Sequence, residues 1–128
     1  MKEMTRLPDT ELEIMKAIWK AGKTLSTSEV KALLEQKRLW NISALQTLLN
    51  RLIDRGFLES HKEGKQRFYS AIIEEKDYLA YENKLFLDKV NNSSVTKLVA
   101  SLYDSRSISE EDLDELAAFI RGKTGGEA

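Results

Sequence analysis

The stretch of sequence that decides the fold is residues 42–71, which read ISALQTLLNRLIDRGFLESHKEGKQRFYSA. In its first half, leucine or isoleucine recurs every three or four residues, which predicts a helix with one buried face. We expect that face to consist of Leu45, Leu48, Leu49, Leu52 and Ile53. Gly56 permits the left-handed backbone that ends many helices. Residues 57–62 and 66–70 then alternate around a short polar linker with a glycine, so the second half predicts a β-hairpin.

Two shorter helices are predicted upstream of this stretch. Their apolar faces consist of Leu12, Met15, Ile18 and Trp19 in the first helix and of Val30, Leu33 and Leu34 in the second. Gly22 is expected to end the first of them. Three helices followed by a two-stranded ribbon is the element order of a winged helix-turn-helix domain, in which the hairpin is the wing.

Hydrogen-bonding side chains indicate where these helices begin. The segments Thr10-Glu11-Leu12-Glu13 and Ser26-Thr27-Ser28-Glu29 have the pattern of a capping box, in which a hydroxyl and a carboxylate bond to backbone amides reciprocally. Asn41 or Ser43 is suited to cap the third helix, and Gln46 is spaced to complete a box that begins at Ser43. We therefore expect the three helices to begin next to these residues.

Helical spacing returns after Ile73 and continues almost to the end of the chain. It predicts a long helix through about Asn91, a shorter one around Val95–Leu102, and a last one that begins at Ser109. The predicted protein is therefore mainly α-helical. Its predicted organisation is a winged-helix DNA-binding domain in residues 1–71, a three-helix dimerisation domain in residues 72–121 and a flexible tail in residues 122–128.

The apolar faces of the last three helices predict a dimer interface. Three short helices attached to a small domain do not easily enclose a core of their own. About ten large apolar side chains, at ~1.5–3 kcal/mol each when fully buried, are more than a monomer is expected to expose. The simplest cover is the same helices in a second copy, and the alternative is that they fold back on the first domain. The predicted interface residues are Tyr78, Tyr81, Leu85, Phe86, Val95, Leu98, Leu102, Leu113, Leu116 and Ile120.

The charge of the chain is distributed unevenly. Residues 1–71 carry 13 basic and nine acidic side chains, whereas residues 72–128 carry seven basic and 12 acidic ones, and the formal net charge is −1. A positive first part favours contact with a polyanion such as nucleic acid, although small imbalances are common in other proteins too. The chain has no cysteine and no apolar run near the roughly 20 residues that span a bilayer. We therefore expect a cytoplasmic protein without disulfides, signal peptide or membrane helix.

The outward face of the third helix carries side chains that recognise base edges. Glutamine and asparagine pair with adenine, alanine and threonine methyls contact the thymine methyl, and arginine binds guanine or a phosphate. The basic residues around the hairpin turn are suited to phosphates or the minor groove. The alternatives are an ordinary polar helix face and charges that protect a strand edge from aggregation. The predicted DNA-binding residues are Ser43, Ala44, Gln46, Thr47, Asn50 and Arg51 in the helix and Lys62, Lys65 and Arg67 in the hairpin.

Enzyme chemistry is not indicated by the sequence. It has one histidine, His61, in a predicted strand, and it has no catalytic triad, glycine-rich phosphate loop or metal-ligand spacing. We therefore expect no catalytic residue, no metal site and no cofactor.

Two other binding functions compete with DNA recognition. A protein-binding winged helix would need an exposed apolar patch where this sequence has polar and basic residues. A repressor gated by a small ligand would need an aromatic pocket in the dimer core, although aromatic stripes on helices are more often simply buried.

From Leu7 to Ile120 the sequence resembles the BlaI/MecI family of penicillinase repressors. The residues that carry the resemblance, in the same order and spacing, are Leu12–Trp19, Trp40, Thr47–Leu52 with Gly56, His61–Ser70 and Tyr78–Val90. The resemblance implies a homodimer that binds double-stranded DNA at an inverted-repeat operator and blocks transcription of antibiotic-resistance genes.

The resemblance also implies a mode of release. Family members are typically cut in their penultimate helix after a membrane sensor protease detects a β-lactam, and the matching bond here is Ser101–Leu102. The best-known members carry an Asn-Phe pair at that bond. In the third helix, Ala44 and Gln46 occupy positions that are often threonine and a basic residue, which predicts either a different operator sequence or weaker contacts with phosphates. Copper-responsive relatives use a C-terminal cysteine cluster, so copper sensing of that kind is excluded.

Overall fold

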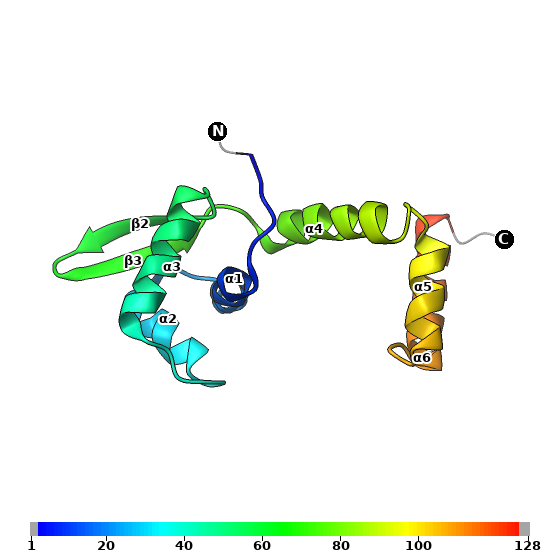
Figure 1. Ribbon diagram of the computed structural model, residues 1–128, viewed down its shortest axis with the longest axis horizontal. Helices are drawn as coiled ribbons and strands as arrows, with labels where there is room; N and C mark the ends of the chain where they lie inside the picture. Colours follow the sequence, from blue (N-terminus) through cyan, green and yellow to red (C-terminus); the bar gives the residue numbers. More distant parts are fainter. Residues whose placement is uncertain (1–2, 126–128) are drawn as a thin grey trace. The chain divides into compact units, whose positions relative to one another are not determined.

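The computed structural model describes residues 3–125, which divide into two compact units, one up to Glu82 and the other from Asn83 onward (Figure 1). The elements in chain order are α1 Asp9–Ala21, β1 Leu25–Ser26, α2 Thr27–Leu34, α3 Ile42–Asp54, β2 Leu58–Glu63, β3 Gln66–Ala71, α4 Glu75–Val90, α5 Val95–Asp104 and α6 Glu110–Lys123. The first unit is a winged helix-turn-helix domain. The predicted fold class, mainly α-helical with this domain at the front, is confirmed.

The helices α1, α2 and α3 pack around the core of the first unit, and the β2–β3 hairpin extends beside them (Figure 1). The predicted inner face of α3 points into this core. Leu45, Leu49 and Leu52 are fully buried, whereas Leu48 and Ile53 lie at its edges and are partly buried. A fully buried leucine contributes about 1.5–3 kcal/mol relative to an exposed one. One face therefore holds α3 in place, and the opposite face is left available for binding.

The beginnings of α1 and α2 differ in how far they follow the predicted caps. In α2 the capping box is confirmed, because Glu29 N donates to Ser26 Oγ at 3.2 Å and Ser26 N donates to Glu29 Oε1 at 2.8 Å. The second bond holds the pKa of Glu29 below its ordinary value. The box at Thr10 is wrong, since the N-cap position lies two residues earlier, at Pro8, and α1 begins at Asp9. Glu13, which that box required, accepts a bond from an arginine of the α2–α3 loop instead.

The beginning of α3 is capped by Asn41, whose Oδ1 accepts a hydrogen bond from Ala44 N at 3.0 Å. Of the two predicted caps, Asn41 is therefore the one used, and the box from Ser43 to Gln46 does not form. The physical reason is a tertiary contact: Gln46 Nε2 donates to the hydroxyl of Tyr69 at 2.8 Å. Gln46, which the sequence predicted to cap its own helix, thus bonds to β3 instead.

The sheet is antiparallel and has three strands in the order β1-β3-β2. The predicted hairpin is present, with its first strand shifted by one residue and its second strand longer by one, so that Glu63 pairs with Gln66 across a turn at Gly64, where φ is 64°. The strand β1 was not predicted, because two residues are too few to show alternation. It pairs Leu25 with Tyr69, which makes β3 the central strand.

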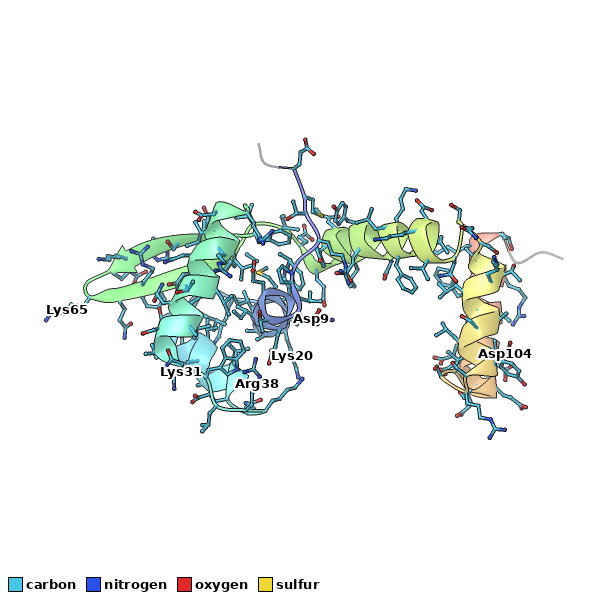
Figure 2. All side chains as sticks on the ribbon, viewed as in Figure 1. Asp9, Lys20, Lys31, Arg38, Lys65 and Asp104 are labelled. Atoms are coloured by element: carbon cyan, nitrogen blue, oxygen red, sulfur yellow. The ribbon has the colours of Figure 1, made fainter. Side chains whose placement is uncertain are left out.

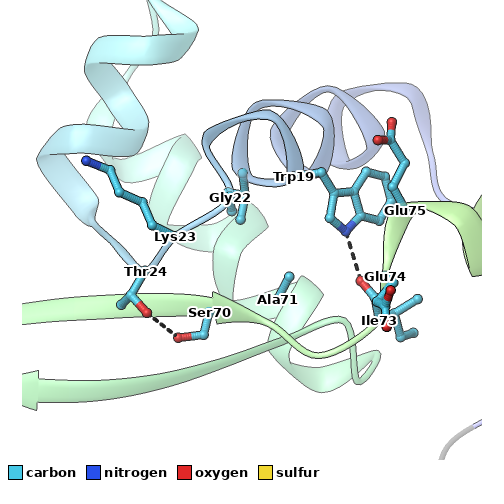
Figure 3. Close-up of a pocket in the computed structure, with 10 residues that line it drawn as sticks. Trp19, Gly22, Lys23, Thr24, Ser70, Ala71, Ile73, Glu74 and Glu75 are labelled. Atoms are coloured by element: carbon cyan, nitrogen blue, oxygen red, sulfur yellow. Dashed lines mark hydrogen bonds between the residues drawn. The ribbon is translucent and has the colours of Figure 1, made fainter.

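Two hydrogen bonds attach the sheet and the segment after it to the region around the end of α1 (Figure 3). Thr24 Oγ1 and Ser70 Oγ lie 2.9 Å apart, and Trp19 Nε1 donates to the carbonyl oxygen of Ile73 at 2.8 Å. These four residues border an open hollow of about 410 Å³. The bonds hold the chain in place where it leaves β3 and enters α4.

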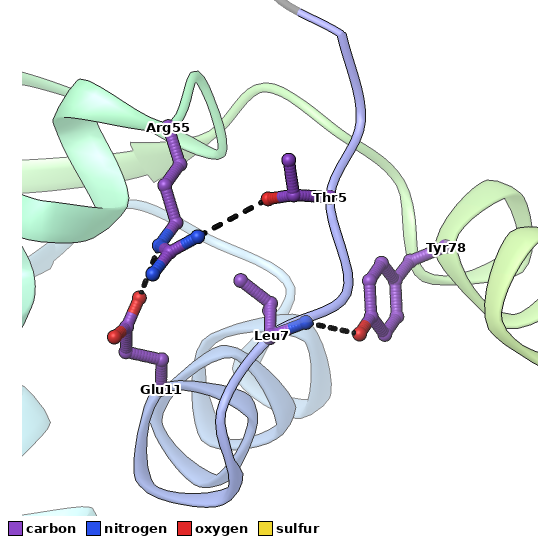
Figure 4. Close-up of polar contacts among 5 residues, drawn as sticks. All are labelled: Thr5, Leu7, Glu11, Arg55 and Tyr78. Atoms are coloured by element: carbon purple, nitrogen blue, oxygen red, sulfur yellow. Dashed lines mark hydrogen bonds and ion pairs between the residues drawn. The ribbon is translucent and has the colours of Figure 1, made fainter.

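The start of α4 belongs to the winged-helix unit, which differs from the predicted boundary near residue 72. Tyr78 is fully buried, and the centre of its ring lies 5.5 Å from the centre of the Phe57 ring and 5.9 Å from that of the Trp19 ring. Its hydroxyl accepts a bond from Leu7 N at 2.7 Å (Figure 4) and donates to Glu82 at 2.6 Å. Burial, followed by the bond to Glu82, raises the pKa of Tyr78 to about 12. The prediction that Tyr78 forms a dimer interface is corrected, because its own chain covers it.

The second unit consists of the end of α4 and the helices α5 and α6. Ser94 caps α5, and Ser109 and Asp112 form a capping box at the start of α6. The helix α6 continues through Lys123, so the predicted tail begins later than residue 122, and residues 126–128 of that tail lie outside the described residues. In the described part of this unit, no large apolar side chain is fully buried.

Candidate DNA-binding surface

The outward face of α3 is polar and accessible. Ser43, Ala44, Thr47, Asn50 and Arg51 are all exposed, and Gln46 is half-buried at the side of the helix that faces β3. Their spacing places them on one side of a helix, away from the leucines that anchor it. The structure therefore brings together all six residues that the sequence predicted for this helix, on an element that the core holds rigidly.

The loop before α3 is held by a chain of polar contacts. The Arg38 guanidinium lies 4.1 Å from the centre of the Trp40 ring and donates to Glu13 at 2.9 Å. Trp40 N donates to Glu35 Oε2 at 3.0 Å, and Lys31 donates to the same oxygen at 2.9 Å. The bond from Lys31, followed by the one from Trp40, holds the pKa of Glu35 below its usual value. These contacts set the position at which α3 begins.

The end of α3 is attached to α1 by an ion pair. Arg55 Nε donates to Glu11 Oε1 at 2.8 Å, and its Nη1 donates to Thr5 Oγ1 at 3.2 Å (Figure 4). Glu11 is 1% exposed, so its carboxylate depends on this partner for compensation of its charge. Arg55 therefore acts as an anchor of α3, whereas the exposed Arg51 is available to a ligand.

The wing presents the predicted basic residues. Lys62 and Lys65 are exposed, and Lys65 lies at the tip of the hairpin (Figure 2). Arg67 is half-buried and donates to Ser60 Oγ at 2.9 Å. Lys62 and Arg67 are direct partners across β2 and β3. Like charges in such a pair destabilise a hairpin unless an anion lies against them, which is the expected property of a phosphate-binding surface.

A polar groove runs between the start of α2, the side of α3 and the wing. It has a volume of about 510 Å³ and is lined by Ser26, Thr27, Ser28, Gln46, Lys62, Lys65, Gln66 and Arg67. Four of these residues were predicted to bind DNA from the sequence. Thr27 and Ser28 also line the groove but were not among the predicted residues, because their hydroxyls were assigned only to a helix cap. Their position at a helix N-terminus was the available indication, since such ends favour phosphates.

The apolar residues predicted for a dimer interface fall into two groups. Tyr81 is partly buried against the core of the first unit, as Tyr78 is fully. The remaining predicted residues in α4, α5 and α6 are half-buried or exposed, with Phe86 49% and Val95 59% exposed. Phe119, which is 61% exposed, was not among the predicted residues, although it lies three residues after Leu116 on the same helix. Exposed apolar side chains thus cluster in the sequence of the second unit.

The described residues 3–125 contain no helix that is long and apolar enough to cross a membrane. Within the same range, no group of three or more histidine or acidic side chains is arranged to hold a metal ion. A polar helix face beside a basic wing, on a winged helix-turn-helix domain, defines a DNA-binding protein.

Comparison with known proteins identifies the family. The family model of the penicillinase repressor matches residues 7–122, and the chain belongs to this family of DNA-binding repressors. It is 35% identical over 120 residues to the penicillinase repressor of Bacillus licheniformis, covering 94% of this chain and 93% of that protein. It is 26% identical over 117 residues to the methicillin resistance regulatory protein MecI of Staphylococcus aureus strain N315, covering 91% of this chain and 94% of MecI.

Two solved structures resemble the first part of the chain. One is the solution structure of the DNA-binding domain of the repressor BlaI, with 42% identity and a TM-score of 0.54 over 61% of this chain and 94% of that one. The other is monomeric BlaI of Bacillus licheniformis in complex with the blaP half-operator, with 42% identity, a TM-score of 0.50 and the same coverage. The similarity covers the winged-helix unit, in which the candidate surface lies.

Proposed function

We propose that this chain represses transcription by binding, as a homodimer, to an operator made of two inverted half-sites. The observation that carries the proposal is the surface formed by the polar face of α3 and the basic groove beside it. The helix α3 enters the major groove, and the wing and the start of α2 contact the flanking phosphates. The complex of the relative BlaI with a half-operator supports one half-site for each chain.

Dimerisation is assigned to the exposed apolar side chains of the second unit. Leu85, Phe86, Val95 and Ile120 are each at least two-fifths exposed, and Phe119 joins the residues predicted from the sequence. A second copy of the same helices is the simplest partner that removes these side chains from water. Two linked binding heads also hold a palindrome more tightly than one, because the second head binds at a high effective concentration.

The regulated genes are proposed to be those that confer β-lactam resistance, and the setting is the cytoplasm, where the operator DNA lies. The names of the relatives, a penicillinase repressor and a methicillin resistance regulatory protein, support this assignment. Release is proposed to follow from cleavage of the Ser101–Leu102 bond in a pathway that begins at a membrane β-lactam sensor. Both residues lie inside α5, so a protease must first unwind that helix. The chain itself is assigned no catalytic role.

The two competing functions are less well supported. A protein-binding winged helix is expected to expose an apolar patch on α3, and the described face is polar. A ligand pocket among the aromatic residues of α4 would need free space beside Tyr78, yet Tyr78 is fully buried against Trp19, Phe57 and Tyr81. We therefore retain operator binding as the proposed function.

The test of this proposal is selection of bound fragments from a random genomic DNA pool, followed by fluorescence anisotropy at two salt concentrations. We expect a palindrome to be enriched and bound by two chains, with affinity that falls steeply as salt rises. Weak binding without an enriched sequence would contradict operator recognition and would favour a protein partner instead.

A further inference from the structure

Gln46 differs from the other residues on the outward face of α3. The others are exposed, whereas Gln46 is half-buried and its side chain crosses to the sheet, where Nε2 donates to the Tyr69 hydroxyl at 2.8 Å. Gln46 also lines the polar groove beside the wing. Its amide therefore lies between the outward face of α3 and the polar groove.

The hydroxyl that receives this bond is held from several sides. Tyr69 is fully buried and stands on the central strand β3, where it pairs with Leu25 on one side and Ser60 on the other. Its oxygen also lies 3.5 Å from Thr27 Oγ1, at the first residue of α2. The acceptor is thus carried by a fully buried ring that stands on the central strand of the sheet and lies next to the start of α2.

We propose that Tyr69 is a positioning residue for base recognition, because its hydroxyl holds the Gln46 side chain in one rotamer. This inference rests on the proposed function, in which α3 lies in the major groove. A glutamine amide has two N–H donors and one carbonyl acceptor. The bond to Tyr69 uses one donor and leaves one N–H and the carbonyl oxygen, which is the pair that matches the major-groove edge of adenine.

Holding the Gln46 side chain in place is expected to increase discrimination between base pairs more than the overall affinity for DNA. An unrestrained glutamine samples several rotamers, and only some of them direct its amide toward one base edge. Immobilising such a side chain only on binding weakens the correct contact roughly twofold to tenfold. Loss of the Tyr69 hydroxyl should therefore relax discrimination at the base pair that Gln46 contacts and leave the phosphate contacts unchanged.

The test compares the wild type with Tyr69→Phe, Gln46→Met and the double variant on the operator selected by the wild type. Each position of one half-site is replaced in turn by the other three base pairs, and affinities are measured by fluorescence anisotropy. Gln46→Met removes the amide at nearly the same length and identifies the position that Gln46 reads. Phenylalanine preserves the buried ring of Tyr69, and thermal unfolding of each variant checks that the domain is folded.

We expect Tyr69→Phe to reduce discrimination at that position roughly twofold to tenfold, with the other positions and the salt dependence unchanged. In the Gln46→Met background, Tyr69→Phe should have no further effect. Unchanged discrimination in Tyr69→Phe, or an equal loss at every position, would overturn the inference. It would also be overturned if Gln46→Met altered no position. Failure of the proposed function is recognised separately, because the wild type would then select no operator at all.

A measurement on the wild type keeps the inference testable if Tyr69→Phe does not fold. We expect the Gln46 side-chain amide to show slowed solvent exchange in NMR spectra, with the exposed Asn50 amide as the internal comparison. Equal exchange of the two amides would show that the Tyr69 bond does not persist in solution and would overturn the inference.

Discussion

Arg51 and Lys65 are both exposed cations of the winged-helix unit, but they are placed differently. Arg51 lies on α3 among the residues proposed to read bases, whereas Lys65 lies at the tip of the wing. A guanidinium matches the two acceptors of the guanine edge, while an ammonium on a flexible stem acts as a point charge near phosphates. Substitution of the two residues should therefore have different effects on operator binding.

Arg51→Ala should weaken operator binding by about 1–3 kcal/mol and relax the preference at one base pair. The physical reason is loss of a bidentate contact to a base edge. Anisotropy titrations on the selected operator and its single-base variants measure both effects. Arg121→Ala, which removes an exposed arginine of α6, is the matched control and should bind like the wild type. If Arg51→Ala binds as tightly as the wild type, α3 is not the reading helix.

Lys65→Ala should weaken binding to all sequences alike. The lysine is proposed to neutralise one phosphate, so its loss should reduce the slope of log affinity against log salt by about 1. Titrations over a salt series, on the operator and on a scrambled duplex, provide the measurement. A loss confined to one base pair of the operator would contradict the phosphate assignment.

The buried hydroxyl of Tyr78 predicts a loss of stability in alkaline solution. Because burial raises its pKa to about 12, the neutral form is favoured in the folded state. The stability from this effect is fully present below the ordinary tyrosine pKa of about 10 and is lost as pH rises toward about 12. The difference in unfolding free energy between the wild type and Tyr78→Phe, measured in urea, should therefore shrink over that range. A constant difference between the wild type and Tyr78→Phe over that range would contradict the assignment.

At the scale of elements, periodic segments were predictable and contacts between them were not. The helix α3 and the wing follow from spacing, because five leucine or isoleucine positions and a strand alternation define them locally. The strand β1 has two residues, so it forms only because β3 is beside it. The bond of Gln46 to Tyr69 spans 23 residues, and the hydroxyl of Tyr78 bonds to Leu7 at the other end of the unit. Such tertiary partners leave no local pattern in the sequence.

Leu49→Ala tests whether the inner face of α3 holds that helix against the core. Leu49 is fully buried, and its truncation should lower the unfolding free energy by about 2–5 kcal/mol through lost burial and a cavity. Chemical unfolding followed by circular dichroism measures the change. Leu39→Ala is the matched control, because Leu39 is 85% exposed and its loss should change stability by less than about 0.5 kcal/mol. Equal effects of the two substitutions would show that α3 is not packed as described.

At the scale of the whole molecule, the two units expose different kinds of side chain. The first unit has a closed core and an exposed polar and basic face. Both features are expected of a DNA-binding domain. The second unit leaves its large apolar side chains at least partly exposed in the described residues, so it lacks a closed core of its own. In the proposed dimer, such a division would couple DNA binding to dimerisation, so disruption of the second unit should weaken repression without altering the candidate DNA-binding surface.

Leu85→Asp should convert the protein to a monomer. The side chain lies in α4 and is 42% exposed, and a carboxylate there would be buried without a partner in the proposed interface. Sedimentation velocity measures the oligomeric state, and Leu39→Asp introduces the same charge at an exposed leucine of the first unit as a control that should remain dimeric. On DNA, the Leu85→Asp monomer should keep the affinity for a half-site and lose the gain that the full palindrome provides, because that gain depends on linking two heads. A variant that still sediments as a dimer would place the interface elsewhere.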